Sequence, residues 1–191
     1  MRVTGGIGKG RKLKVPAGSR VRPTSDKVKQ ALYNILGEKT EGALFLDLYA
    51  GTGGIGIEAL SRGAARVVFV DDARNSLLVI KQNIEQLGFG ERAQVVPSKV
   101  EAFLKKTSEQ FDIIFLDPPY IVEQGPLLQS IAASRLLKQD SIVISEHFKK
   151  QPSPERAGGL ELYREAQYGD TVLAFYKYRS QVTEAGRREV L

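Results

Sequence analysis

The stretch Ala43-Leu-Phe-Leu-Asp-Leu-Tyr-Ala-Gly-Thr-Gly-Gly-Ile-Gly56 decides the fold predicted for this chain. It begins with an apolar run typical of a buried strand. A glycine loop follows, and Gly51, Gly53 and Gly56 have the G-x-G-x-x-G spacing that opens a helix in dinucleotide-binding proteins. Glycine lets the backbone pass close to a ligand. The stretch therefore predicts a site for an adenosine-containing cofactor; the alternative is a tight turn that needs glycine and binds nothing.

Apolar runs and amphipathic stretches alternate along the rest of the chain. The spacing predicts further strands over 66–70, 93–96, 111–116 and 141–145. It predicts helices from the N-cap cluster at 24–26 to Leu36, and over 54–62, 76–87, 100–106 and 127–137, with a loop over 151–159. Two last strands, 160–168 and 171–178, flank the turn Gly169-Asp170. The predicted fold class is α/β, with a mostly parallel seven-stranded sheet, helices on both faces and a C-terminal antiparallel hairpin.

Composition excludes several classes of protein. The chain has 191 residues, 42% of them hydrophobic and 26% charged, which fits one folded domain with a small appendage. It has no cysteine and a single histidine, His147, so we expect neither a disulfide nor a metal site. Apolar runs such as 113–116 are too short to span a bilayer, and the N-terminus lacks the apolar core of a signal peptide. We expect a cytoplasmic protein with no membrane partner.

The positive charge of the chain is concentrated at its N-terminal end. The net charge is +6, yet residues 1–30 alone carry nine Lys or Arg and one acid, Asp26. This distribution indicates a polyanionic partner, most simply a nucleic acid; the alternative is a basic tail without a specific role. We divide the chain into a basic, glycine-rich arm (1–23), a folded domain (24–179) and a polar tail (180–191). The glycines of the arm predict that it is mobile until this polyanionic partner binds; they are Gly5, Gly6, Gly8 and Gly10.

Two acidic residues sharpen the prediction of the cofactor. Asp71 lies twenty residues after Gly51, at the end of the second predicted strand, where a carboxylate accepts hydrogen bonds from ribose hydroxyls. Asp47 lies at the tip of the first strand. A carboxylate there repels the pyrophosphate of NAD but suits the cationic sulfonium and amino group of S-adenosylmethionine. The alternative is that Asp47 only accepts hydrogen bonds from loop amides.

The tetrapeptide Asp117-Pro118-Pro119-Tyr120 directly follows a predicted strand. Two successive prolines continue neither a strand nor a helix, so the chain leaves the sheet in a stiff turn at the edge where α/β sheets bind ligands. The Asp117 carboxylate and the Pro118 carbonyl would accept the N–H groups of an exocyclic amino group, and Tyr120 would stack on its base. The residues thus predict amino-group methylation; the alternative is a capped Pro-Pro turn.

Four segments together resemble the bacterial RsmD family of class I S-adenosylmethionine-dependent methyltransferases. They are Gly10-Arg-Lys-Leu13, Arg22-Pro-Thr24, Asn34-x-Leu36 and the stretch from Asp47 to Gly63. The resemblance covers roughly residues 2–178. It implies a Rossmann-like domain that methylates the N2 amino group of a guanine in 16S ribosomal RNA. The expected partner is 16S rRNA or a small-subunit assembly particle, and we expect a monomer.

The resemblance also implies roles for individual residues. The cofactor-binding set is Asp47, Ala50, Gly51, Gly53, Asp71, Asp72, Ser98, Lys99, Val100 and Asp117, and the catalytic set is Asp117, Pro118 and Tyr120. The RNA-binding set is Arg11, Lys12, Arg20, Arg22 and Thr24, whose cations would contact phosphates. The chain departs from the family pattern at two positions. Where the family often has a second acid, this chain has Ala73, and Asp72 would take its place. Where the family often has Asp or Asn near the adenine, this chain has Lys99.

Three other functions remain open from the sequence. Asp-Pro-Pro-Tyr also occurs in DNA adenine methyltransferases, so an adenine-N6 methyltransferase acting on DNA or RNA is the alternative within the same class. A nicotinamide-dependent oxidoreductase would use the glycine loop but gives no role to residues 117–120. An inert RNA-binding module would bind RNA without a cofactor.

Overall fold

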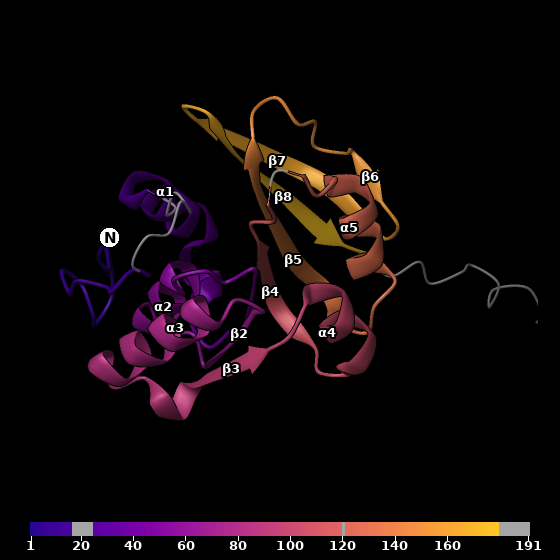
Figure 1. The fold of residues 1–191 in the computed structure, drawn as a ribbon. Coiled ribbons are helices and arrows are strands. Elements are labelled where there is room, and N and C mark those ends of the chain that lie inside the picture. The colour runs from indigo at the N-terminus through magenta and orange to yellow at the C-terminus, as the bar shows by residue number, and fades with distance from the viewer. Residues whose placement is uncertain (17–24, 120, 180–191) are drawn as a thin grey trace, which may run out of the picture.

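The computed structural model describes residues 1–16, 25–119 and 121–179 and is built on one eight-stranded sheet. The strands lie in the order β3-β2-β1-β4-β5-β8-β7-β6 (Figure 1). The first five in this order are parallel, and β8, β7 and β6 continue the sheet antiparallel. The bounds are β1 Leu44–Leu48, β2 Arg66–Asp71, β3 Ala93–Pro97, β4 Phe111–Leu116, β5 Leu137–Phe148, β6 Arg156–Ala157, β7 Leu160–Tyr168 and β8 Thr171–Tyr178.

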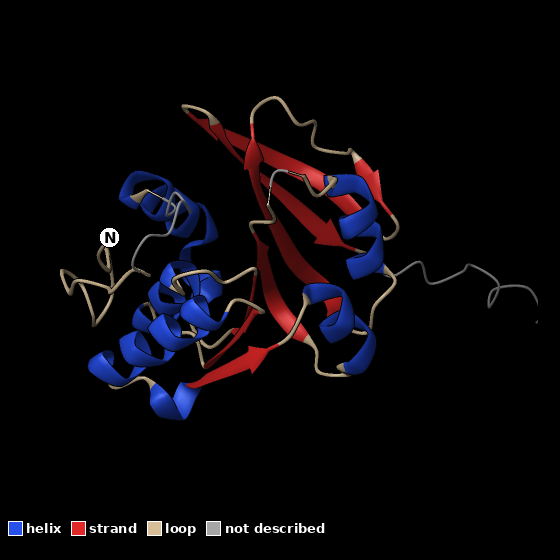
Figure 2. Ribbon diagram, in the orientation of Figure 1, coloured by secondary structure: helices blue, strands red, loops and turns tan. Residues whose placement is uncertain are grey.

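Helices cover both faces of this sheet, as predicted (Figure 2). On one face lie α1 (Asp26–Leu36), α2 (Gly54–Ser61) and α3 (Arg74–Leu87); on the other lie α4 (Val100–Lys106) and α5 (Gln124–Ala132). Alternate strand residues point to opposite faces. Phe45 accordingly packs in the core under α1 to α3, whereas Leu46 packs in the core under α4 and α5. Two short 3-10 helices, η1 (Gly37–Thr40) and η2 (Gly90–Arg92), complete the elements.

The structure corrects the number of strands, the bounds of the helix predicted over 127–137 and the bounds of the strand predicted over 141–145, which is β5. The sheet has eight strands rather than seven because β6, inside the predicted loop 151–159, pairs with the start of β7. The helix predicted over 127–137 begins at Gln124 and ends at Ala132. Pro126 is tolerated because it lies in the first turn of α5, where its missing N–H leaves no intrahelical bond unmade. Strand β5 then begins at Leu137, which pairs with Phe111 beside an irregularity in the ladder.

The described part of the N-terminal arm is folded onto the domain, contrary to the expectation of a mobile arm. Arg2 and Lys12 form an antiparallel bridge, and Val3 is only 1% exposed. Gly6 has φ +70° and lies so close to α2 that an added Cβ would be 1.8 Å from the Ser61 carbonyl oxygen. Glycine here permits close packing rather than movement. We call residues 1–16 the N-terminal segment. Within the described ranges, no helix combines the length and apolar character needed to cross a membrane.

Candidate active site

The candidate site lies at the carboxyl ends of β1, β2 and β4, where a cavity of about 650 Å³ opens. The structure brings most of the predicted cofactor and catalytic residues to its wall. These are Gly51, Asp71, Asp72, Ser98, Lys99, Val100, Asp117 and Pro118. Asp47, Ala50 and Gly53 do not line it. Tyr120 falls outside the described residues.

Backbone conformation or close packing requires glycine at three positions of the loop. Gly51 and Gly53 have φ of +55° and +73°, and the Gly53 amide donates to the Ala50 carbonyl over 2.7 Å. Gly56 is needed for packing, because an added Cβ would be 2.3 Å from the ring of Phe69. Tyr49 also has a positive φ, +56°, which is uncommon for a residue with a side chain. Such strain persists where the surrounding structure imposes it, often at ligand sites.

Asp47 lies beneath the loop rather than on the cavity wall. Its side chain is buried, and Oδ2 accepts a hydrogen bond of 2.9 Å from the amide of Gly56 in α2. Burial raises the pKa of Asp47 well above its ordinary value, and the carboxylates of Asp71 and Asp117 raise it further, against the hydrogen bond from Gly56. The bond to a loop amide that the sequence left as an alternative is therefore present. A role for Asp47 toward the methionine end of a cofactor stays a prediction.

Asp71 ties three parts of the cavity wall together. Its Oδ2 accepts a 2.7 Å hydrogen bond from the Gly51 amide, and its Oδ1 accepts one of 2.8 Å from the Ala73 amide. Its backbone carbonyl accepts from the Ser98 amide over 3.0 Å. Burial raises the pKa of Asp71, with these amide bonds opposing the rise. An ionised carboxylate has about four lone-pair positions, so acceptor capacity remains for ribose hydroxyls.

Asp117 lines the cavity, and its pKa is strongly raised. Burial raises its pKa from the ordinary 3.8 to about 7. The residue directly follows β4, and the turn after it closes with a 2.8 Å hydrogen bond from the Val122 amide to the Pro119 carbonyl. A carboxyl group whose pKa lies near neutral pH, set in a cleft, is characteristic of functional sites. The position and acidity suit an acceptor for an N–H group.

Sequence reasoning missed several residues of the cavity wall. Tyr49, Ala73, Ser76, Glu101, Pro119 and Val122 also line it. Burial and the neighbouring Glu101 carboxylate raise the pKa of Tyr49 to about 12. A signal was available for four of them. Tyr49 lies inside the decisive glycine stretch, and Glu101 immediately follows the predicted site residues Ser98, Lys99 and Val100. Pro119 belongs to the Asp117-Pro-Pro-Tyr120 motif, and Ala73 stands where the family has a second acid.

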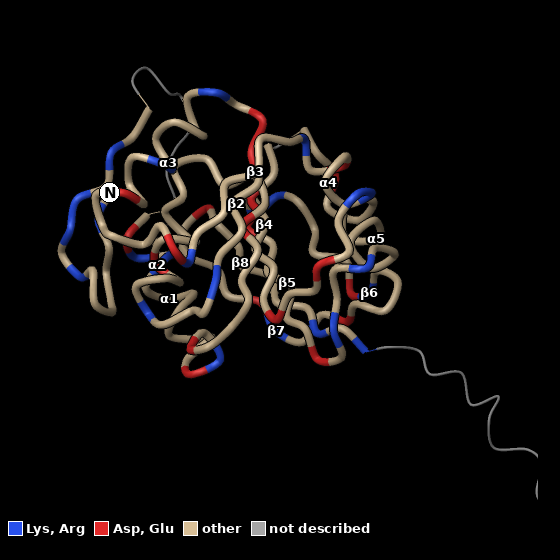
Figure 3. The backbone as a smooth tube through the Cα atoms, turned by 90° about the horizontal axis from the view of Figure 1, so that it is seen from below, with Lys and Arg blue, Asp and Glu red and all other residues tan. Residues whose placement is uncertain are grey.

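The predicted RNA-binding residues divide into two groups. Arg11 and Lys12 lie exposed on the N-terminal segment, where the guanidinium of Arg11 donates to the Gln86 carbonyl on α3 over 3.0 Å. Figure 3 shows the Lys and Arg positions of this segment on one side of the molecule. Arg20, Arg22 and Thr24 lie outside the described residues.

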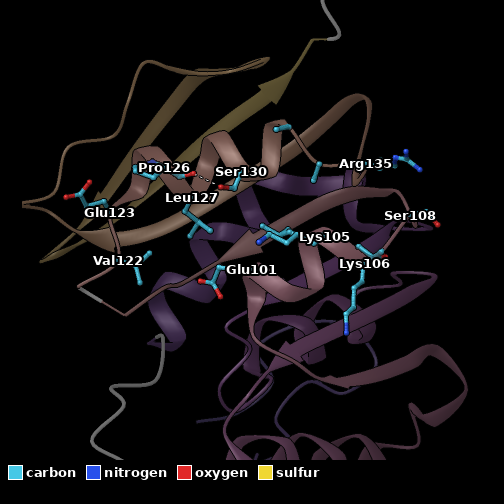
Figure 4. A pocket seen from close by; sticks show the side chains of 14 residues that line it. Glu101, Lys105, Lys106, Ser108, Val122, Glu123, Pro126, Leu127, Ser130 and Arg135 are labelled. Carbon is cyan, nitrogen blue, oxygen red and sulfur yellow. Dashed lines mark hydrogen bonds between the residues drawn. The ribbon is translucent and has the colours of Figure 1, made fainter.

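A second cavity, of about 850 Å³, lies between α4 and α5 (Figure 4). It shares Glu101 and Val122 with the first cavity, and Leu127 is among its lining residues. None of the predicted site residues lines it. Although it is larger, it lacks the strand-end carboxylates, so the chemistry favours the first cavity as the candidate active site. In the part of the chain that the structure describes, no group of three or more His, Asp or Glu residues is placed to hold a metal ion.

The fold defines the class: a Rossmann-like class I methyltransferase, with the candidate cleft at the carboxyl ends of a mostly parallel sheet. The solved structure of the "Putative methyltransferase yhhF" from Escherichia coli superposes with a TM-score of 0.85 at 29% identity, covering 95% of this chain and 99% of that one.

Sequence comparison narrows this class to a family. Residues 1–177 match the model of the family described as "Conserved hypothetical protein 95". The "Putative rRNA methyltransferase YlbH" of Bacillus subtilis (strain 168) is 40% identical over 94% of this chain and all of its own length. The "Ribosomal RNA small subunit methyltransferase D" of Escherichia coli (strain K12) is 32% identical over 95% of this chain and 91% of its own. The chain belongs to the "Conserved hypothetical protein 95" family, and the resemblance to the bacterial RsmD family is confirmed.

Proposed function

We propose that the protein transfers a methyl group from S-adenosylmethionine to the N2 amino group of a guanine in 16S rRNA of the small ribosomal subunit. One observation carries the proposal: Asp117 and Pro118 line the same cavity as Gly51 and Asp71. An acceptor for an amino group and a candidate cofactor site thus share one cleft. The ribosomal substrate is supported by the printed names of the B. subtilis and E. coli relatives.

The residues of the cleft fit this cofactor. Asp71 has acceptor capacity left for ribose hydroxyls, and the pKa values of Asp47, Asp71 and Asp117 are all raised. A cation bound nearby favours ionisation of such carboxyls, whereas an anionic pyrophosphate opposes it. When bound, S-adenosylmethionine supplies a methyl group activated by the positive charge on its sulfur.

Asp117 and Pro118 would position the nucleophile. The lone pair of an exocyclic guanine nitrogen is delocalised into the ring, which makes it a poor nucleophile. Hydrogen bonds from its two N–H groups to the Asp117 carboxylate and the Pro118 carbonyl localise that lone pair and orient it. The base must leave its stack to reach this position. Asp117, with a pKa of about 7, is suited to hold the proton that the amino group loses before water removes it.

The N-terminal segment would bind RNA phosphates. Contacts from Arg11 and Lys12 give affinity that falls with salt but carries no base choice. Replacing both with alanine should weaken RNA binding and flatten its dependence on salt concentration. Lys39→Ala, which removes an exposed cation from η1, is the control and should leave the slope unchanged. An unchanged slope in the double variant would refute the role of the segment.

The test of the whole proposal is transfer of labelled methyl groups to small ribosomal subunits that lack their native methylation, followed by nucleoside analysis. N2-methylguanosine is the expected product. A labelled adenine would keep the cofactor and the role of Asp117 but replace guanine by the adenine-N6 alternative. Asp117→Asn should reduce turnover to a low residual rate with cofactor binding mostly intact, whereas Asp71→Ala should weaken cofactor binding. An unlabelled product from an enzyme that also fails to bind the cofactor would favour the inert RNA-binding module.

A further inference from the structure

Asn83 of α3 joins the N-terminal segment to the glycine loop through one buried carboxamide. Its Oδ1 accepts a 2.8 Å hydrogen bond from the amide of Lys14, and its Nδ2 donates to the Lys14 carbonyl over 3.1 Å. The same Nδ2 donates to the carbonyl of Thr52 over 3.4 Å. Asn83 is completely buried. Both amide N–H groups and the amide oxygen are therefore used, two bonds toward one segment and one toward the other.

The two segments that Asn83 joins have different predicted ligands. Lys14 closely follows Arg11 and Lys12, the cations proposed to contact RNA. Thr52 lies between Gly51 and Gly53, in the loop proposed to approach the cofactor. Helix α3 supports that loop directly, because an added Cβ on Gly53 would be 3.1 Å from Ile80. A displacement at either end of this arrangement would therefore leave a buried polar group of Asn83 without a partner, which costs about 1–3 kcal/mol.

We propose that Asn83 is a positioning residue that couples RNA binding by the N-terminal segment to the conformation of the cofactor loop. The proposal rests on the function proposed above. RNA held by the segment fixes the backbone at Lys14, Asn83 transmits that constraint to the Thr52 carbonyl, and the loop is held in its cofactor-binding shape. Met1 makes a second, weaker contact, since its sulfur lies 3.7 Å from the Thr52 hydroxyl. Of these two contacts, the one through Asn83 is buried and uses both the oxygen and the nitrogen of the carboxamide.

Coupling of this kind is reciprocal, so each ligand tightens binding of the other by the same factor. The factor is measured by titrating S-adenosylhomocysteine against the full-length protein, with and without saturating unmodified 16S rRNA. Asn83→Ala removes the carboxamide without adding charge. Gln86→Ala is the matched control, because Gln86 donates to the Lys12 carbonyl over 3.2 Å and lies on the same helix. No hydrogen bond from the Gln86 side chain to the glycine loop is present among the described residues.

The wild-type protein is expected to bind S-adenosylhomocysteine about fivefold or more tightly with RNA present, the lower end of typical coupling. Asn83→Ala should bring this factor close to one while each ligand alone still binds, and Gln86→Ala should keep the wild-type factor. If Asn83→Ala does not fold, Lys14→Pro removes the amide that donates to Asn83 from the other side, at a residue whose side chain is exposed, and the same loss is expected.

The outcomes separate the inference from the proposed function. A wild-type protein that binds both ligands with no coupling overturns the inference and leaves the proposed function intact. Full coupling in Asn83→Ala, or in Lys14→Pro, also overturns it. A wild-type protein that binds neither ligand refutes the proposed function and the inference together.

Discussion

Lowering the pH from 8 to 6 should reduce kcat/KM for methyl transfer about tenfold, because Asp117 becomes protonated. The proposed mechanism uses the carboxylate form, which accepts the N–H groups of the target nitrogen. Burial raises the pKa of Asp117 to about 7. With that pKa, about 90% of the group is ionised at pH 8 and about 10% at pH 6. Activity is therefore retained above pH 7 and lost as the pH falls through it.

The two kinetic parameters should respond differently. The pH dependence of kcat/KM for the cofactor reports the free enzyme, and that of kcat reports the complex. The midpoint of kcat/KM is therefore expected near pH 7. The positive charge of bound S-adenosylmethionine favours the ionised carboxyl and lowers its pKa. The midpoint of kcat should accordingly lie below that of kcat/KM.

The assay is methyl transfer to unmodified small subunits at fixed ionic strength. The pH runs from about 5.5 to about 8.5, on both sides of the expected midpoint, and only pH values at which the particles stay intact are used. Asp117→Asn should give a low rate that does not change with pH. Asp140→Asn is the matched control: it removes a carboxylate that pairs with Lys177 far from the cleft, and asparagine tolerates the φ of +66° found there. A kcat/KM that is equal at pH 6 and pH 8 would refute ionisation of Asp117 as the basis of activity.

Three further predictions concern stability, and chemical denaturation measures each. Glu58→Ala should cost about 3–5 kcal/mol, because it leaves buried cationic and hydroxyl partners without their carboxylate; the exposed Glu161→Ala should cost under about 1 kcal/mol, and equal losses would contradict the network's role. Gly56→Ala should cost about 1–3 kcal/mol or more by overpacking against an aromatic ring of β2, whereas Gly90→Ala, with open space around it, should be near neutral. Asp117→Asn should stabilise the fold at pH 8 by up to about 4 kcal/mol, because it removes a carboxyl whose pKa is raised by folding; the gain should shrink toward pH 5, and a gain independent of pH would refute the cause.

Local patterns were sufficient to predict most of the fold. The two hairpin strands and β4 have the predicted bounds, because apolar runs flanked by Gly169-Asp170 or by a Pro-Pro turn admit few other readings. The errors lie where periodicity is ambiguous. Residues 124–148 contain a proline that a helix tolerates only in its first turn, and a β5 start that depends on pairing with Phe111. Such pairing between distant residues is invisible in a local pattern.

The N-terminal segment shows a second limit of sequence reasoning. Four glycines in ten residues suggested mobility, but glycine equally permits close packing. The choice was decided by distant partners: Thr4 donates to Glu58 through both its amide and its hydroxyl, each over 2.8 Å, and the Ser61 hydroxyl donates to the Gly5 carbonyl. Glu58 and Ser61 lie shortly after the decisive stretch, yet nothing in the sequence pairs them with the first residues of the chain.

The sequence predicted which acids reach the candidate site, but not that Asp47 is buried beneath the glycine loop. Asp71 ends β2 and Asp117 follows β4, the two parallel strands on either side of β1, so their arrival at one edge of the sheet follows from topology alone. Asp47 precedes the end of β1 by one residue, and the pleat turns it beneath the glycine loop. Sequence spacing placed it at the strand tip but could not assign it to the core side of the cavity wall.

We expect the acids in and beneath the candidate cleft to discriminate between the two cofactor classes that the glycine spacing allows. Strands β2, β1 and β4 are adjacent, so their acids converge, and burial raises the pKa of all three. Holding them ionised opposes folding, since desolvation disfavours the charged form. A pyrophosphate would add negative charge and increase that penalty, whereas a sulfonium and an ammonium group offset it. The same G-x-G-x-x-G loop that fits a dinucleotide is thus placed in surroundings that favour a cationic cofactor, and the favourable electrostatics come from Asp47, Asp71 and Asp117 rather than from the glycines.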